Sequence, residues 1–350
     1  MASHDSAQPP KDVLDAWSIS NATITPITVG LINRSYLATR GTERFVLQRL
    51  HPSFSAAVHL DIEAITKHLE NKGVGTTRLL PTQSGALWQE AHDGIWRLLR
   101  HVEGLVHSEV RDQQVAHAAG RAVADFHHAL LDLKHTFHNV RPGVHDTLLY
   151  LNKLQILLRA HRLDPEMEPF VALSKAILMH GKQLPLEPPL PQRLIHGDLK
   201  ITNLIFDPAC PEVRAIIDLD TLARGTLDAE MGDAFRSWCN PKGESNVAAE
   251  IDVQLFAAAV TGYAQGSRDW ITDSEVHALR PGTERIALEL ASRFCIDGFE
   301  DSYFGWDASR FASRREHNLV RTQSQLSLAA SIRENRDALD REVARAFRVH

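Results

Sequence analysis

The chain has 350 residues, 43% of them hydrophobic and 23% charged, which is enough for one large domain or two modest ones. Its 38 basic and 44 acidic residues give a net charge of -6, which argues against binding to nucleic acid or to an anionic membrane surface. No apolar run has the length of a bilayer span or of a signal peptide, and the three cysteines are too widely spaced for a disulfide framework. We therefore expect a cytoplasmic protein with free thiols.

The first hundred residues show strand and turn signals after a polar leader, which we expect to be flexible. Strands are predicted at residues 23–29, 35–39 and 45–50, around residue 79, and at 95–102, with Gly- and Asp-containing turns between several of them. Residues 60–69 carry apolar side chains at helical spacing and end near Gly73. This pattern predicts a small lobe of strands with one helix.

The rest of the chain has mainly helical patterns. Helices are predicted at residues 113–131, 146–162 and 168–179, and again from about residue 233 to the end. A Pro-rich connector at 184–191 precedes two short apolar runs, 193–195 and 215–219, which are typical of buried strands. We expect an α+β protein whose first lobe spans residues 1–103 and whose second, mostly helical lobe spans 104–350.

The most informative motif follows the strand expected at 193–195. It reads His196-Gly197-Asp198, with Lys200 and Asn203 in the next five residues. His-x-Asp-x-x-x-x-Asn is the spacing of the protein-kinase catalytic loop. In that chemistry Asp198 would orient an acceptor hydroxyl and receive its proton, Asn203 would bind Mg²⁺ on the phosphates of ATP, and Lys200 would balance charge on the transferred group.

A second carboxylate is needed to hold the metal, and the apolar run 215–217 opens onto Asp218. Carboxylate and amide oxygens are hard ligands that suit Mg²⁺. The first motif alone could occur by chance, or His-Gly-Asp could be a plain turn. The flanking strands and the nearby Asp218 favour the catalytic interpretation.

These motifs resemble the aminoglycoside phosphotransferase and choline kinase superfamily. Within it, Ile217-Asp218-Leu219-Asp220-Thr221 and residues 231–236 are similar to the N-acetylhexosamine 1-kinase branch, as are segments 30–36, 46–49 and 293–304. The similarity extends from about residue 30 to residue 328. It implies a two-lobed, protein-kinase-like fold, with a small β-rich nucleotide lobe and a larger helical lobe carrying the catalytic loop and the acceptor site.

In such a lobe a strand-turn-strand segment covers the phosphates with its backbone N–H groups. The residues expected to serve there are Gly30, Asn33 and Ser35. The third strand usually carries a Lys for the phosphates, but here Gln48 stands in that place with Arg49 beside it. Neighbouring strand residues point to opposite faces, so only one of them can serve, and the sequence leaves open which.

Three further residues complete the predicted nucleotide site. Glu63, on the following helix, is the expected pairing carboxylate, although it could equally lie on a solvated helix face. Arg100 and Val102 belong to the predicted hinge, whose backbone groups could meet adenine.

Acceptor binding requires several directed polar groups and an aromatic face. The predicted set is Asp220, Arg236, Arg293, Asp297 and Tyr303, although ion pairs between C-terminal helices would account for some of them almost as well. The family resemblance implies that Asp233 braces the catalytic loop from the start of the next helix, and that His127 packs between helices.

The expected partner is a small-molecule acceptor, most simply a hexose or N-acetylhexosamine phosphorylated at its anomeric hydroxyl. A kinase for another small alcohol, such as an aminoglycoside, choline or an amino-acid hydroxyl, stays open. Choline would call for an aromatic cage and aminoglycosides for an acidic cleft. A pseudokinase is a third alternative because of Gln48, but intact Asp198, Asn203 and Asp218 oppose it.

Overall fold

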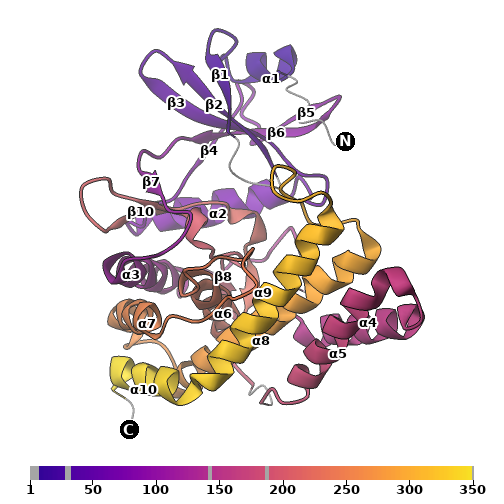
Figure 1. Cartoon of the computed structure of the whole chain (residues 1–350). Coiled ribbons are helices and arrows are strands. Elements are labelled where there is room, and N and C mark those ends of the chain that lie inside the picture. Colours follow the sequence, from indigo (N-terminus) through magenta and orange to yellow (C-terminus); the bar gives the residue numbers. More distant parts are fainter. Residues whose placement is uncertain (1–7, 28–32, 141–143, 186–188, 349–350) are drawn as a thin grey trace. The chain divides into compact units, whose positions relative to one another are not determined.

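A computed structural model describes residues 8–27, 33–140, 144–185 and 189–348, and the chain forms two compact units (Figure 1). Unit 1 comprises Met1–Glu103, Asp132–Val140 and Ala215–Asp220, and unit 2 comprises Gly104–Leu131, Arg141–Arg214 and Thr221–His350. The architecture is α+β, with an antiparallel sheet in unit 1 and a largely helical unit 2, as predicted from the sequence. Segments 132–140 and 215–220, which we had expected in the second lobe, belong to unit 1.

The sheet of unit 1 has the strand order β1-β2-β3-β6-β4, and β5 pairs with β6. Its strands are β1 (Thr23–Ile27), β2 (Arg34–Arg40), β3 (Glu43–Arg49), β4 (Leu79–Leu80), β5 (Gln89–Ala91) and β6 (Gly94–Arg100). Its pairs are antiparallel, and the register places Ser35 opposite Gln48 and Gln48 opposite Arg97. These three polar side chains therefore share one face of the sheet.

The other face of the sheet is apolar and is covered by α1 (Lys11–Ala16). Val13 and Trp17 pack there against Leu47, Trp96 and Leu98, all of them buried. Helix α1, which was not predicted, begins at the last residue of the polar leader Met1–Lys11, and burial of these side chains ties it to the sheet.

Two further segments complete unit 1. Helix α2 (Val58–Asn71) follows β3, and its buried Asp61 accepts hydrogen bonds from the backbone N–H groups of His138 and Asn139. Segment 215–220 is held by Ile216, whose N–H donates to the carbonyl of Gly75 and whose carbonyl accepts from Thr76 Oγ1. Segments distant in the sequence are thus held in unit 1 by hydrogen bonds to their backbone groups.

The helices of unit 2 surround a core of buried apolar side chains. They are α3 (Gln113–Leu130), α4 (Thr147–His161), α5 (Glu168–Gly181), α6 (Leu227–Trp238), α7 (Val253–Ser267), α8 (Asp273–Glu300), α9 (Arg314–Glu334) and α10 (Arg336–Phe347). The long helices α8 and α9 lie side by side in Figure 1. Helix α6 begins at Leu227, six residues before the predicted start at about 233, which places Asp233 inside the helix.

Short strands and single helical turns lie in the segments that connect the helices. They are β7 (Leu105–Val106), β8 (Arg193–Ile195), β9 (Leu204–Phe206), β10 (Val213–Ile216) and β11 (Ala223–Gly225), and the single turns are η1 (Pro165–Met167), η2 (Ile201–Asn203) and η3 (Leu219–Thr221). Strand β8 pairs with β11, and β7 with β9. The predicted strand 215–219 ends at Ile216, because Asp218 has φ 65° and η3 begins at Leu219.

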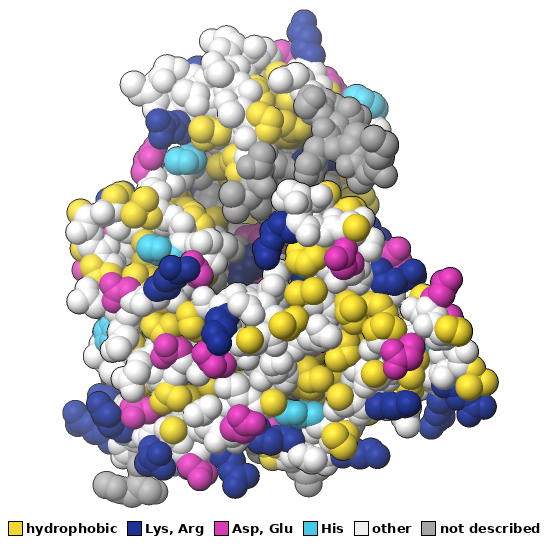
Figure 2. Space-filling model, viewed as in Figure 1, with side chains coloured by type: hydrophobic (Ala, Val, Ile, Leu, Met, Phe, Trp, Pro, Cys, Tyr) yellow, Lys and Arg dark blue, Asp and Glu magenta, His cyan; other side chains and the backbone are white. Residues whose placement is uncertain are grey.

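On the face shown in Figure 2, acidic, basic and apolar side chains are interspersed over unit 2. None of the described helices combines the length and the apolar character needed to cross a membrane.

Candidate active site

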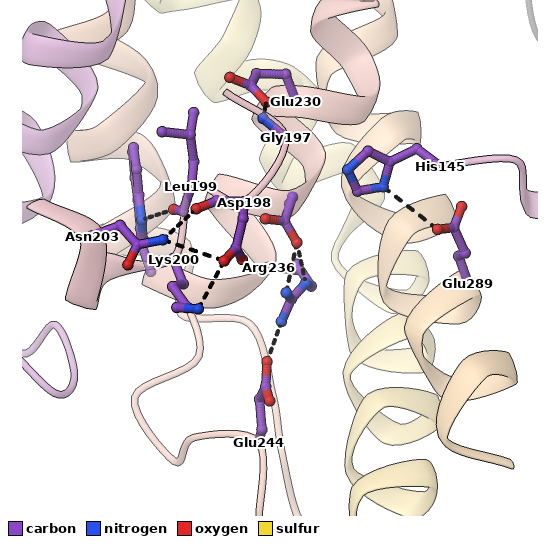
Figure 3. Close-up of polar contacts among 12 residues, drawn as sticks. His145, Gly197, Asp198, Leu199, Lys200, Asn203, Glu230, Arg236, Glu244 and Glu289 are labelled. Atoms are coloured by element: carbon purple, nitrogen blue, oxygen red, sulfur yellow. Dashed lines mark hydrogen bonds and ion pairs between the residues drawn. The ribbon is translucent and has the colours of Figure 1, made fainter. Parts of the chain in front are cut away.

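The loop between β8 and β9 carries the predicted catalytic residues, and its backbone is fixed at several points (Figure 3). Gly197 has φ 79°, and a Cβ there would lie 2.6 Å from the carbonyl oxygen of Thr221, so the turn requires glycine. The carbonyl of Leu199 accepts a hydrogen bond of 2.7 Å from the indole of Trp238. These contacts hold Asp198 on a rigid support.

Asp198 is an ionised carboxylate with two side-chain partners. Its Oδ2 accepts hydrogen bonds from Lys200 Nζ at 2.7 Å and from Asn203 Nδ2 at 3.3 Å. Burial acts to raise the pKa of Asp198, but the adjacent Lys200 ammonium outweighs it and holds the pKa below its ordinary value. The carboxylate is therefore ready to orient a hydroxyl and to accept a proton late in the reaction.

Asn203 is oriented by the same loop. Its amide nitrogen donates to the backbone carbonyl of Asp198 at 2.8 Å as well as to the Asp198 carboxylate. With the nitrogen engaged, the carbonyl oxygen of Asn203 is the atom that can bind a cation, and an amide oxygen is a hard donor of the kind that Mg²⁺ prefers. Asp218 lies in unit 1, two residues beyond β10.

The carboxylate that braces the loop is Glu230, one turn before Asp233 on α6. It accepts hydrogen bonds from the N–H groups of His196 at 2.7 Å and Gly197 at 2.9 Å. Its Oε1 also lies 3.3 Å from His127 Nε2, and the other ring nitrogen of His127 lies 3.1 Å from the Tyr263 hydroxyl. Burial acts to raise the pKa of Glu230, but the contact with His127 and the loop amides hold it below the ordinary value.

Asp233 takes a different role from the one expected. Its Oδ1 accepts two hydrogen bonds from Arg236, whose Nη1 also lies 2.5 Å from Glu244. Asp233 Oδ2 is buried and has no hydrogen-bond partner in the described part of the chain. Arg236, predicted as an acceptor ligand, is thus buried within an acidic pair, which raises its pKa despite burial. The sequence missed Glu230 because nothing local indicates that its side chain reaches the loop.

In unit 1 a buried polar network crosses the face of the sheet opposite α1. Arg97 makes a two-pronged ion pair with Asp220, with Nη2 2.9 Å from Oδ2, and donates to Gln48 Oε1 at 2.7 and 2.9 Å. Gln48 Nε2 donates to Ser35 Oγ, and Asn33 Nδ2 donates to Asp220 Oδ2 at 2.6 Å. Arg97 and Asp220 are each 2% exposed.

The contacts of the two candidate residues on β3 differ, while the phosphate contact itself stays a prediction. Arg49 points to the β5–β6 turn, where it pairs with Asp93 at 3.2 Å, whereas Gln48 faces Arg97. The cation on this face is therefore Arg97 on β6, a residue that the sequence interpretation did not single out. An Arg amid the apolar run Ile95-Trp96 and Leu98-Leu99 was the available signal.

Two other predicted ligands also have different contacts in unit 1. Glu63 pairs with Arg78 at 2.7 Å, so it is not a partner of the β3 residues. Asp220, predicted as a substrate ligand, has both oxygens engaged by Arg97 and Asn33. Arg100 is exposed and Val102 half-buried, and their hinge role stays a prediction. Gly30 lies outside the described residues.

The three predicted acceptor ligands near the C-terminus differ in their contacts. Asp297 accepts hydrogen bonds from the N–H groups of residues 302–304 and from Asn318 Nδ2, which satisfies both oxygens and makes it the anchor of that loop. Tyr303 is exposed, with its ring edge-on to Phe304. Arg293 lies over the rings of Tyr150 at 5.4 Å and Phe304 at 5.6 Å.

Comparison with known proteins identifies the family. The model of the phosphotransferase enzyme family (APH) matches residues 23–267, more than half of the chain. The chain belongs to this family. It is a phosphotransferase that acts on an alcohol group of a small molecule.

Solved structures share the fold of this phosphotransferase. The amicoumacin kinase hAmiN in complex with AMP-PNP, Ca²⁺ and Ami is 12% identical, with 87% of each chain covered and a TM-score of 0.59. A microcompartment-associated aminopropanol kinase is 14% identical over 94% of this chain and 97% of its own, with a TM-score of 0.63. Choline kinase from Cryptosporidium parvum Iowa II is 14% identical over 94% and 93%, with a TM-score of 0.55. The predicted hexosamine branch stays a prediction.

The network in unit 1 gives the phosphotransferase a pH-dependent stability through His59. This ring is fully buried on α2, and burial, followed by the Arg97 charge, lowers its pKa from 6.5 to about 4, with Asp220 opposing. At a pH between these two pKa values, His59 binds a proton in the unfolded chain but not in the folded chain. The free energy of unfolding therefore falls as the pH falls. We expect wild type to lose about 2 kcal/mol more than His59→Gln between pH 7.5 and pH 5, measured by urea unfolding.

The control for this prediction is His92→Gln, which changes an exposed histidine in the same unit. It should follow the wild-type pH dependence. Equal losses of stability in wild type and His59→Gln would mean that His59 is not held neutral in the folded protein.

Proposed function

We propose that this phosphotransferase transfers the γ-phosphoryl group of Mg·ATP to a hydroxyl of a small polyhydroxylated acceptor, with the anomeric hydroxyl of a hexose or N-acetylhexosamine as the leading candidate. The supporting observation is the fixed loop of Asp198 and Asn203, in which a carboxylate and an amide are oriented by one backbone segment. Phosphoryl transfer depends mainly on positioning and charge stabilisation, which such a loop supplies.

Each residue of the loop has a separate task in this proposal. Asp198 orients the acceptor hydroxyl and receives its proton as the new P–O bond forms. Lys200, at 2.7 Å from Asp198, keeps that carboxylate ionised and offers positive charge next to the transferred group. Asn203 and Asp218 would hold Mg²⁺, which would neutralise charge on the phosphates of the nucleotide.

Asp218→Ala should reduce nucleotide affinity in the presence of Mg²⁺ to the level measured with EDTA, because a charged ligand is lost from a hard-cation site. Isothermal titration calorimetry with AMP-PNP, with and without Mg²⁺, measures this difference. Glu43→Ala, which removes an exposed carboxylate on β3, is the matched control and should retain the Mg²⁺ effect. A full Mg²⁺ effect in Asp218→Ala would remove Asp218 from the metal site.

The second candidate acceptor is an amino alcohol, since aminopropanol kinase and choline kinase share the fold. Acceptor-dependent ADP formation separates the two, with N-acetylglucosamine, N-acetylgalactosamine, glucose, aminopropanol, choline and kanamycin as the panel. Turnover above the background rate with the sugars alone supports the leading candidate. Turnover with the amino compounds alone would replace it with the second.

A further inference from the structure

Helix α4 of unit 2 is apolar on both of its sides. Its inner side packs on α5 and α8, and Leu154 there is fully buried. Its outer side carries a stripe of four large apolar residues, Leu148, Leu149, Ile156 and, just after the helix ends, Leu163. These side chains are 69%, 50%, 66% and 84% exposed, in that order. A surface helix normally has one apolar side, which faces the core, so this outer stripe requires a separate explanation.

The outer stripe has the size of an interaction site. Its four side chains expose roughly 300 Å² of apolar area. The largest apolar patch on a typical monomer covers about 300–600 Å² and is often functional. Helices α4 and α5 lie at one side of unit 2 in Figure 1, and α5 adds the exposed Met179 to the same part of the unit. A partner can therefore approach this side of unit 2.

The spacing of the outer stripe is symmetric about Ile156. Leu149 precedes it by seven residues and Leu163 follows it by seven, which is about two helical turns in each direction. A two-fold axis through Ile156 therefore sets each Leu149 against the Leu163 of a second copy. The same axis sets Asn152 against the small side chain of Ala160, each four residues from the centre. The stripe is thus complementary to itself, which is the pattern of an isologous dimer.

The charged side chains at the edges of the stripe are compatible with this pairing. Residues 147–163 include Lys153, Arg159 and Arg162 but no acidic residue. Lys153 is already paired with Glu300 of α8 at 2.8 Å. In an antiparallel pair centred on residue 156, the arginines of the two copies are offset by at least about 9 Å along the helix axis. That is about one Debye length at physiological salt, so their mutual repulsion is small.

We propose that this phosphotransferase forms a two-fold symmetric dimer in which the outer stripe of α4 packs antiparallel against the same stripe of a second copy. The inference does not depend on the identity of the acceptor. Homodimer interfaces are about 65% apolar, so the stripe implies about 500 Å² buried per protomer, against about 800 Å² in a standard interface. The dimer is therefore weak, with a dissociation constant in the micromolar range. The net charge of -6 disfavours an anionic membrane as the occupant.

Sedimentation equilibrium at protein concentrations from about 1 to about 300 µM tests the association. Wild type should pass from monomer to dimer over this range. Ile156→Glu should stay monomeric, because it places two carboxylates against each other in an apolar contact. Val247→Glu is the matched control, since Val247 is an apolar residue of unit 2, 49% exposed and outside the stripe. It should dimerise as wild type does, and both variants should keep the wild-type melting temperature at low concentration.

Cysteine cross-linking tests the register of the two helices. Facing Cα atoms on helices packed about 8–10 Å apart are about 4–6 Å from each other, which suits a disulfide. In a Cys210→Ser background, which removes the exposed native thiol, Ile156→Cys should form a covalent dimer on oxidation. Leu149→Cys should cross-link to Leu163→Cys when the two proteins are mixed. It should not cross-link to itself, because the two copies of residue 149 are about 21 Å apart along the axis.

Three results would each overturn the proposal: wild type that is monomeric at every concentration, a dimer that survives Ile156→Glu, and cross-linking of Leu149→Cys to itself. Binding of monomeric wild type, but not of Ile156→Glu, to phosphatidylserine vesicles would replace the second copy with a membrane surface as the occupant of the stripe.

Discussion

Asp198→Asn is expected to lower kcat by roughly 10²–10⁴-fold, the usual contribution of a positioned general base. The amide keeps the shape of the carboxylate, so the loop that Glu230 and Trp238 hold should retain its conformation. It cannot accept the proton of the acceptor hydroxyl, and the ion pair with Lys200 at 2.7 Å is lost. Affinity for Mg·ATP should stay within about threefold of wild type, because the change removes no proposed metal ligand.

Single-turnover rates of phosphoryl transfer from radiolabelled ATP measure this effect without interference from product release. Asp207→Asn is the control, because Asp207 follows β9 and pairs with the half-exposed Arg214. It should keep the wild-type rate. A rate for Asp198→Asn within tenfold of wild type, about 1.4 kcal/mol of barrier, would show that Asp198 is not the base.

Arg97→Met is expected to destabilise the protein by about 3–5 kcal/mol, because it leaves the buried Asp220 carboxylate without its ion-pair partner. Gln48 Oε1 loses its two donors at the same time. Since Asp220 belongs to the short segment that also carries Asp218, the KM for Mg·ATP should rise as well. Urea unfolding followed by tryptophan fluorescence measures the loss of stability.

The double variant Arg97→Met/Asp220→Leu should be more stable than Arg97→Met, since it removes the unpaired charge together with its partner. Arg40→Met, which breaks an exposed pair with Glu43 on the same sheet, should cost less than about 1 kcal/mol. A loss in Arg97→Met no larger than that of Arg40→Met would mean that Asp220 finds another partner and that the network is not a main support of unit 1.

The parts of the site that are local in sequence could be predicted. Asp198 and Asn203 are five residues apart on one loop, so their spacing is itself the geometric signal. The strands β2, β3 and β6 and the helices α3, α4 and α5 were expected within a few residues of their bounds, because apolar periodicity reports directly which face is buried. Membership of the phosphotransferase family follows from the same local motifs.

Contacts between distant residues could not be predicted in this way. Arg97 and Asp220 are 123 residues apart, and His145, in the turn before α4, is 144 residues away in sequence from Glu289 on α8. The sequence left open whether Gln48 or Arg49 of β3 serves the phosphates, and the strand register places a third residue, Arg97 of β6, opposite Gln48. Asp297 was expected to bind the acceptor. It lies near the end of α8 and instead accepts hydrogen bonds from three loop N–H groups. The sequence motif is the same for either role.

The most direct test of the account is the identity of the phosphorylated product. After incubation of the wild-type protein with Mg·ATP and N-acetylglucosamine or N-acetylgalactosamine, phosphorus NMR should show a phosphomonoester coupled to the anomeric proton. That product should be non-reducing and acid-labile, with one ADP formed for each ester. An ester on another hydroxyl would contradict the anomeric assignment, and inorganic phosphate as the only product with every acceptor of the panel would contradict phosphoryl transfer to a small-molecule hydroxyl.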